Sequence, residues 1–444
     1  MYNNQIIEWI LEKCRENLTD LKSEDFEYKK AFLKEWSCLD EQLRERDSTY
    51  CDTLKLKYKA RNLYKKISEF VLADSSISAT ENEMYSFYIG SYQKKKILEN
   101  YYTRTSPRPI YQKILNNFIA EFIYPYTSFG YFQITNSGMS AFTVALLFSK
   151  YFYKLGKRIV MQSNLYYELY FNIDFVYNKY DILEFNQINL DLMNDESTHC
   201  IITGYFNDLN IYKFLDTLRK TNRKSFLFVI IDRTLFSVID NYYQILSKDR
   251  IPTNVFLISV ESLLKNHQYG LDMTNLGFIT IYNRLINAKL LKGILQKMEQ
   301  TIYNSPSEAD LLATLPFNYY YSKQMFLKAS ANTKLIYQAL KSKNSNKRYD
   351  IVLTAPKELY ISNSLWYGNQ IYIYESSGKI SDKFNKLIQS SLFVNGQSFG
   401  FDITRISLCI DYFDKREMIR IAIGTEPIET VNKIIQVLEV VLFE

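Results

Sequence analysis

The sequence predicts an α/β protein with a mostly parallel sheet, a helical region before it and a smaller α+β domain after it. From about residue 108, short apolar runs alternate with helical patterns, and the runs recur about every 25 to 35 residues. The residues before this point show helical patterns alone. Alternation of this kind is typical of βαβ units, in which each pair of parallel strands is joined by a helix.

The N-terminal region is the first element of this prediction. Residues 5–73 have helical periodicity, and their first helix places Ile6, Ile7, Trp9, Ile10, Leu11 and Cys14 on one face. Charged residues occupy the outer faces of the helical patterns that follow. We therefore expect amphipathic helices that pack against one another.

The sheet and the C-terminal part follow. A long helical region is expected over 283–345, and the last hundred residues mix strands with a final helix, "IETVNKIIQVLEVVLF". We divide the 444 residues into a helical region and arm (1–107), a large α/β domain (108–300) and a C-terminal α+β domain with its linking helix (301–444). The expected strands of the large sheet are "FQIT", "RIVMQS", "CIITGYF", "FLFVIID", "NVFLISV" and "LGFITIY".

Composition excludes several classes of function. The net charge of +6 comes from 54 basic and 48 acidic residues, and no basic stripe with interleaved aromatic residues indicates nucleic-acid binding. The five cysteines are scattered without the spacing of a zinc site, so no metal is expected. No apolar stretch is long enough to span a membrane, and we expect a cytoplasmic protein.

The stretch "TNSGMSAFTVALL" is the first candidate site. It joins an expected strand to an apolar helix through a turn that contains Gly138 and Met139. Free backbone N–H groups at a helix N-terminus bind anions such as phosphate. The alternative is a helix cap in a tight turn, with no ligand.

Two further candidates follow later strands. Asp232 ends the run "FLFVIID", where a carboxylate either serves a ligand at the carboxyl end of the sheet or caps the next helix. Lys265 follows the run "NVFLISV", where it is either a Schiff-base lysine or an ordinary surface lysine. A phosphate turn, an aspartate and a lysine in this order are the parts that a pyridoxal-phosphate enzyme of the aspartate-aminotransferase fold needs.

With these residues in place, the chain resembles the Cys/Met-metabolism family of pyridoxal-phosphate enzymes, which includes cystathionine γ-lyase, cystathionine γ-synthase and methionine γ-lyase. The similar segments occur in the family's order over residues 100–440. They are "YTRTSPRP", "TNSGMSAFTVALL", "NLYYELY", "VIIDRT", "SLLKNHQYGLD", "QSFG" and "IRIAIGTE". The resemblance implies fold type I, with a mostly parallel seven-stranded sheet, and pyridoxal 5'-phosphate as cofactor.

The resemblance also implies a role for each matching residue. Lys265 would hold the cofactor as a Schiff base and move the Cα proton, and Tyr166 would stack on its ring. Asp232 would bind the pyridine nitrogen, whereas Arg420 and Ser398 would bind the substrate carboxylate. The implied cofactor-binding residues are Gly138, Met139, Tyr166, Asn207, Asp232, Ser262 and Lys265, together with Tyr102 and Arg104 from a neighbouring subunit.

The sequence departs from the family pattern at several of these segments. Tyr167 and Glu168 replace two glycines after the stacking tyrosine, and Leu264 replaces a threonine before the lysine. Gln397 stands before the serine where several lyases have glutamate. These changes leave the cofactor site in place and leave the substrate open.

The reaction expected from the resemblance is elimination or replacement at Cγ or Cβ of an amino acid, as in carbon–sulfur lyases and γ-synthases. An aminotransferase, racemase or decarboxylase on the same fold is the alternative, and a catalytically silent scaffold is a third. Because the segment that contains Tyr102 and Arg104 crosses between subunits in the family, we expect a homodimer or homotetramer with a shared site. We expect the partner molecules to be a small amino-acid substrate, with no nucleic acid and no membrane.

Overall fold

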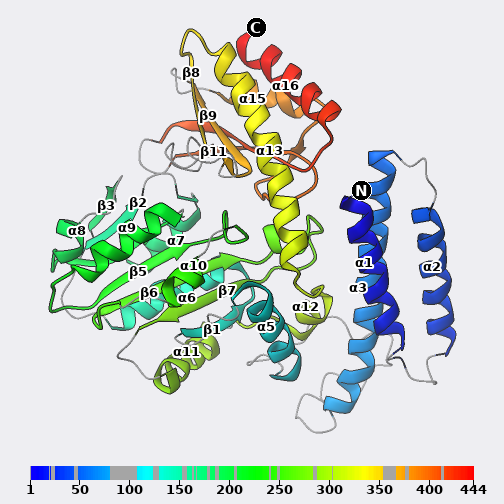
Figure 1. The fold of residues 1–444 in the computed structure, drawn as a ribbon, viewed down its shortest axis with the longest axis horizontal. Helices are drawn as coiled ribbons and strands as arrows, with labels where there is room; N and C mark the ends of the chain where they lie inside the picture. The colour runs from blue at the N-terminus through cyan, green and yellow to red at the C-terminus, as the bar shows by residue number, and fades with distance from the viewer. Residues whose placement is uncertain are drawn as a thin grey trace. The chain divides into compact units, whose positions relative to one another are not determined.

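The structure of the chain is a computed structural model (Figure 1). It comprises two compact units, Met1–Phe118 with Leu271–Asn275 and Ser305–Phe317, and Ile119–Gly270 with Leu276–Asn304 and Asn318–Glu444. The division into three parts at residues 107 and 300 stays a prediction. The structure describes all residues except 1, 20, 22–25, 45–48, 81–107, 124–129, 153–157, 163–164, 167, 178–180, 186–189, 205–207, 240–241, 248–250, 284–287, 303, 354–366, 376–379 and 412–414.

The first unit contains the helices α1 (Tyr2–Thr19), α2 (Phe26–Arg44) and α3 (Tyr50–Thr80), and α1 packs against both of the others. The apolar face predicted for the first helix is buried in this packing, apart from the half-buried Trp9. The helix α3 runs past residue 73, where the sequence pattern ends, because its last residues include no glycine or proline that would stop a helix. Among the described helices, none has both the length and the apolar character needed to cross a lipid bilayer.

The second unit contains a seven-stranded sheet with the strand order β1-β7-β6-β5-β4-β2-β3. The strands from β3 to β6 are parallel, and β7 runs antiparallel to both of its neighbours, β6 and β1. The predicted mostly parallel seven-stranded sheet is therefore confirmed. The strands are β1 (Gly130–Thr135), β2 (Arg158–Gln162), β3 (Asp181–Phe185), β4 (Thr198–Thr203), β5 (Leu227–Asp232), β6 (Val255–Ser262) and β7 (Gly277–Tyr282).

The centre of this sheet is buried along its whole length. The strands β4, β5, β6 and β7 are buried almost without interruption, as expected for strands covered on both faces. The helix α6 (Gly138–Tyr151) packs against β1, β5, β6 and β7, and its buried residues join the main apolar core. Other helices that follow strands of this sheet include α7 (Glu168–Val176), α8 (Leu190–Asn194), α9 (Asp208–Arg219) and α10 (Tyr242–Ser247).

The long helical region predicted over 283–345 is three helices in the structure. They are α11 (Ala288–Ile302), α12 (Glu308–Ala313) and α13 (Tyr319–Lys343). Pro306 and Pro316 lie in the two gaps, and proline lacks the N–H that a helix interior needs. Ser307 and Asn318 then cap α12 and α13, since their side chains accept hydrogen bonds from backbone N–H groups of the first turn.

The C-terminal part contains a second sheet of five strands in the order β10-β11-β12-β9-β8 (Figure 1). The helices α13, α15 (Ser381–Ile388) and α16 (Ile428–Phe443) pack with it around an apolar core. The predicted smaller α+β part is therefore present. Its strands are β8 (Tyr349–Leu353), β9 (Gln370–Glu375), β10 (Val394–Asn395), β11 (Arg405–Ile410) and β12 (Glu417–Ala422).

Candidate active site

The turn between β1 and α6 is the first part of the site. Ser137 is the N-cap of α6, with extended backbone (φ −168°, ψ 162°), and its hydroxyl accepts a hydrogen bond from the Ser140 N–H at 3.1 Å. The helix cap of the alternative interpretation is therefore present. It does not exclude an anion site, because the N–H groups of Gly138 and Met139 in the first turn have no acceptor within the helix.

Close packing holds this turn against the carboxyl end of β6. A Cβ atom on Gly138 would lie 2.6 Å from the Cβ of Ser262, so no other residue fits without a shift. From the other side, a Cβ on Gly277 would lie 2.1 Å from the Ser137 carbonyl oxygen. The structure therefore brings Gly138 and Ser262 together, with Met139 next to Gly138 in the same turn.

Asp232 is the last residue of β5 and is partly buried. Its Oδ1 accepts a hydrogen bond from the Thr234 N–H at 3.0 Å, and the Thr234 hydroxyl accepts one from the Ser262 N–H at 3.0 Å. Burial raises the pKa of Asp232, and Glu261 adds to the effect, whereas the Thr234 hydrogen bonds and the Lys265 cation oppose it. A cationic partner at this carboxylate would relieve the cost of burial.

Lys265 follows β6 and lies just before the short 3-10 helix η3 (Asn266–Gln268). Its Nζ donates a hydrogen bond to Ser398 Oγ and lies 5.5 Å from the centroid of the Phe399 ring. Gly400, at φ +81°, packs against the backbone of Lys265, where a Cβ would lie 2.6 Å from the carbonyl carbon. The lysine is therefore held in place by the C-terminal part of the chain.

Arg420 projects from β12 and is 1% exposed. Its Nε donates a hydrogen bond to Gln370 Oε1 at 3.0 Å. Within the part of the chain that the structure describes, its buried Nη1 has no hydrogen-bond partner. Its Cζ lies 5.4 Å from the centroid of the Tyr166 ring and 6.0 Å from that of Phe399, so these rings line the same space.

The predicted residues thus form two groups. In the first group, Thr234 connects Asp232 to Ser262, which packs against the α6 turn. In the second group, the Phe399 ring lies near both Lys265 and Arg420. Ser398 contacts Lys265, and Tyr166 lies near Arg420. The lysine cation acts on Asp232 and so connects the groups. Three predicted residues, Tyr102, Arg104 and Asn207, lie outside the described residues.

Three residues of the site are missing from the sequence prediction. Thr234 and Phe399 lie within the matched segments "VIIDRT" and "QSFG", so those segments could have indicated them. Gln370 lies at the start of β9, opposite Ala422 in the sheet register, and no motif marks it. Its role depends on strand pairing, which the sequence alone does not show.

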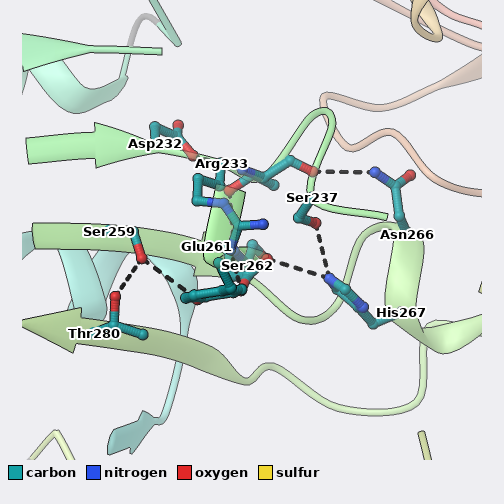
Figure 2. A network of polar contacts seen from close by, with 11 residues as sticks. Asp232, Arg233, Ser237, Ser259, Glu261, Ser262, Asn266, His267 and Thr280 are labelled. Carbon is teal, nitrogen blue, oxygen red and sulfur yellow. Dashed lines mark hydrogen bonds and ion pairs between the residues drawn. The ribbon is translucent and has the colours of Figure 1, made fainter. Parts of the chain in front are cut away.

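A buried polar network adjoins the site (Figure 2). It contains Arg233, Ser237, Glu261 and His267, each of which lies next to or near a predicted site residue. Burial acts to raise the pKa of Glu261, but Arg233 and His267 outweigh it, and the pKa is lowered. The Glu261 carboxylate is therefore ionised inside the protein.

Comparison with known proteins adds the fold. No protein-family model matches the chain, and no curated protein sequence matches it. Solved structures do: metB from Corynebacterium glutamicum is 17% identical, with a TM-score of 0.54, over 77% of this chain and 88% of that one. The chain has the fold of this protein. It is fold type I, the aspartate-aminotransferase-like fold that the sequence predicts.

Two structures of CalE6 from Micromonospora echinospora show the same fold. One is described as apo CalE6, a methionine gamma lyase, and is 13% identical, with a TM-score of 0.53, over 80% of this chain and 91% of that one. The other is described as a cystathione gamma lyase, is also 13% identical, and has a TM-score of 0.54 over 80% and 92% of the two chains. In a fold type I sheet, ligands bind outside the carboxyl ends of the parallel strands, which is where Asp232 and Lys265 lie.

Proposed function

We propose that this chain is a pyridoxal-phosphate-dependent enzyme that eliminates or replaces a group at Cγ or Cβ of an amino acid. The carbon–sulfur lyases and γ-synthases catalyse reactions of this type. The proposal is supported by the order of the sequence segments and by the fold shared with metB and CalE6.

The donors on the described residues fit this cofactor. The first turn of α6 offers backbone N–H groups to a phosphate, with the Ser262 hydroxyl beside it. Asp232 offers a carboxylate to a ring N–H, and a protonated ring nitrogen would offset the burial that raises the pKa of this carboxyl group. Lys265 offers an amine to an aldehyde, and Tyr166 would supply an aromatic face.

The cofactor, when bound, would supply the electron-withdrawing ring that makes the Cα proton of an amino acid acidic. Lys265 would hold the cofactor through Nζ and, once released, move the proton between Cα and the neighbouring carbon. Ser398 would orient the Lys265 amine, because its hydroxyl already accepts a hydrogen bond from Nζ. The Phe399 ring would exclude water from beneath the amine.

One observation carries the proposal. Arg420 is a buried cation whose Nη1 has no hydrogen-bond partner among the described residues, and its guanidinium lies against the same Phe399 ring as the amine of Lys265. A buried guanidinium is costly without an anion, so the geometry favours an anionic ligand at this point. An α-carboxylate bound by Arg420 would place the Cα atom of an amino acid near Lys265.

We further propose that the active unit is a homodimer or homotetramer, in which Tyr102 and Arg104 of one subunit bind the cofactor phosphate of another. This rests on the resemblance of "YTRTSPRP" to the arm of the family, since the segment lies outside the described residues. Substitution Arg104→Ala should weaken cofactor retention and leave the subunit folded, which gel filtration and cofactor absorbance would measure together.

The test of the function uses the purified chain with pyridoxal phosphate added. The lysine-bound cofactor should give the protein a visible absorbance band, which Lys265→Ala should lose and Lys341→Ala, an exposed lysine of α13, should keep. The loaded protein is then offered O-acetylhomoserine, cystathionine, methionine and cysteine, and ketoacid is measured. Transfer of the amino group to the cofactor would indicate an aminotransferase instead, and no cofactor uptake would contradict the proposal.

A further inference from the structure

The residues that neighbour the candidate site form a charge network of their own. Arg233 directly follows Asp232, Glu261 directly precedes Ser262, and His267 lies two residues after Lys265. Successive residues of a strand point to opposite faces, so Glu261 and Ser262 serve opposite sides of β6. Each of three segments that supply a candidate site residue thus supplies one residue to the network behind it.

The contacts within this network are close, and its members are removed from water. Arg233 Nη1 lies 3.5 Å from Glu261 Oε1, and His267 Nε2 lies 3.4 Å from Glu261 Oε2, with side-chain exposures of 4%, 2% and 1% for Arg233, Glu261 and His267. The Arg233 guanidinium also lies over the rings of Tyr242 and Tyr243, at 4.7 and 4.3 Å from their centroids. The three polar groups are therefore fixed on several sides.

Asn266 and His267 also anchor the segment after Lys265 to the segment after Asp232. Asn266 Nδ2 donates hydrogen bonds to the carbonyl oxygens of Thr234 and Leu235, each at 3.0 Å. His267 Nε2 lies 3.0 Å from Ser237 Oγ. Figure 2 shows the side chains of Asn266 and His267 pointing toward the loop that contains Ser237. Two consecutive residues after the lysine are thus tied to the same loop.

The serine, histidine and glutamate do not form a nucleophilic triad. In such a triad the base contacts the serine through one ring nitrogen and the carboxylate through the other. Here both Ser237 and Glu261 contact Nε2 of His267, and Ser237 is only 7% exposed. The geometry supports positioning and charge compensation instead of nucleophilic attack.

We propose that Arg233, Glu261 and His267 are positioning residues that hold Lys265 opposite Asp232. Within this set, Arg233 and His267 compensate the negative charge of Glu261. This inference rests on the proposed function. Without Arg233, the Glu261 carboxylate would act uncompensated on Asp232 and Lys265. Without His267, the lysine segment would lose one of its anchors.

Several charged and titratable groups surround this part of the chain. A change of charge at Arg233 or Glu261 changes the electrostatic potential at Lys265, and the double substitution cancels the change because it removes one charge of each sign. The groups that face the network and the lysine from the packed elements are Asp232 on β5, Tyr242 and Tyr243 on α10, and Arg420 on β12.

The first test is a titration of the absorbance of the cofactor bound to Lys265. Arg233→Met removes a positive charge and should raise the pH midpoint, whereas Glu261→Gln removes a negative charge and should lower it, each by about half a pH unit. The double variant should return close to the wild-type midpoint. Equal midpoints in all four proteins, or shifts of the same sign, would overturn the proposal.

Arg233→Met alone leaves a buried charge and can fail to fold. In that case Glu261→Gln and the double variant decide. The double variant leaves neither charge of the pair, and in Glu261→Gln the Arg233 guanidinium keeps its contacts with the rings of Tyr242 and Tyr243. The downward shift in Glu261→Gln must then disappear in the double variant. If it persists, Arg233 does not compensate Glu261.

The second test compares the two histidines of the chain. His267→Phe keeps an aromatic ring beside Phe122, whose centroid lies 4.5 Å away, but loses both polar contacts. We expect cofactor release to become about tenfold faster, since the anchor of the lysine segment is lost. The matched control is His199→Phe, a buried histidine of β4 whose Nε2 lies 3.0 Å from the Ser149 carbonyl oxygen.

The control should lose stability and keep the wild-type release rate. Equal release rates in both histidine variants would show that His267 has only a structural role, and the proposal would fail. Cofactor uptake by the wild-type chain, measured first, tests the proposed function itself. A wild-type chain that takes up no cofactor would overturn both proposals, whereas normal uptake with unchanged variants would overturn this one alone.

Discussion

Arg233 and Arg420 are both buried, yet their guanidinium groups are compensated in different ways. Arg233 has the carboxylate of Glu261 on one side and the rings of Tyr242 and Tyr243 on another. Arg420 has a neutral amide partner, two aromatic rings and an Nη1 that no described residue binds. One arginine belongs to an internal ion pair, and the other is neutralised by no described carboxylate.

This difference favours a positioning role for Arg233 and a ligand-binding role for Arg420. A protein that buries a cation stabilises it with an anion of its own unless the anion is to come from outside. On the proposed function, Arg233 stabilises the framework of the site, and Arg420 binds the carboxylate of the substrate. Substitutions at the two positions should accordingly affect different measurements.

The largest effect on stability is expected for Arg233→Met. Removing the guanidinium leaves the Glu261 carboxylate buried without its partner, so unfolding should become easier by about 3–5 kcal/mol. Urea denaturation of the cofactor-free protein measures this. The double variant with Glu261→Gln should recover most of the loss, and a double variant as unstable as the single one would break the comparison.

A smaller effect, and one on substrate binding, is expected for Arg420→Met. No carboxylate is left uncompensated by this change, so stability should fall far less than in Arg233→Met. Loss of a charged hydrogen bond to the substrate should lower kcat/KM by roughly 30-fold, which corresponds to about 2 kcal/mol, mainly through KM. Steady-state kinetics on the most active substrate measures it.

The control for this experiment is Arg405→Met. Arg405 lies on the neighbouring strand β11 and stacks on Phe401, with its Cζ 3.6 Å from the ring centroid. It should keep the wild-type KM. If Arg405→Met raises KM as much as Arg420→Met does, the effect comes from the sheet and not from a carboxylate site.

The smallest effect concerns Asp232 in the cofactor-free protein. Its pKa is raised in the folded state, mainly by burial, so folding favours the protonated form. The ionised Asp232 carboxylate therefore lowers the free energy of unfolding. This loss is absent below the ordinary aspartate pKa and appears as pH rises through the shifted pKa. Asp232→Asn should therefore stabilise the cofactor-free chain at neutral pH and leave it unchanged in acid, as thermal unfolding at both pH values would show.

The same substitution should weaken cofactor retention, because the ring nitrogen loses its anionic partner. A variant that is destabilised at neutral pH without cofactor would show that the carboxylate of Asp232 is already well compensated by the protein. The carboxylate would then resemble Glu261 and not an open binding group.

The sequence predicts the framework of the large sheet better than its edge. Apolar runs predict six strands, and each has a counterpart in the structure, whereas β3 has the sequence DILEF, in which acidic residues interrupt the apolar run. The region 283–345 was predicted as one helical region because its apolar period continues, but Pro306 and Pro316 divide it. Local breakers here outweigh periodicity.

The candidate site shows a similar limit. Asp232 and Lys265 are recognisable because one ends a strand and the other follows one, and Arg420 because it lies in a matched segment. The pair Arg233 and Glu261 was not, because it forms between neighbouring strands and depends on their register. Contacts across a sheet leave no period in the sequence, so the network behind the site appears only in three dimensions.

The close packing at Gly400 affects how the site can open. Gly400 lies against the backbone of Lys265, Ser398 holds its amine, and Gly270 forms a β-bridge with Phe401. The lysine loop and this segment of the C-terminal part are thus joined by main chain as well as side chains. We expect them to move as one rigid body, so that a displacement of this segment would carry the lysine with it.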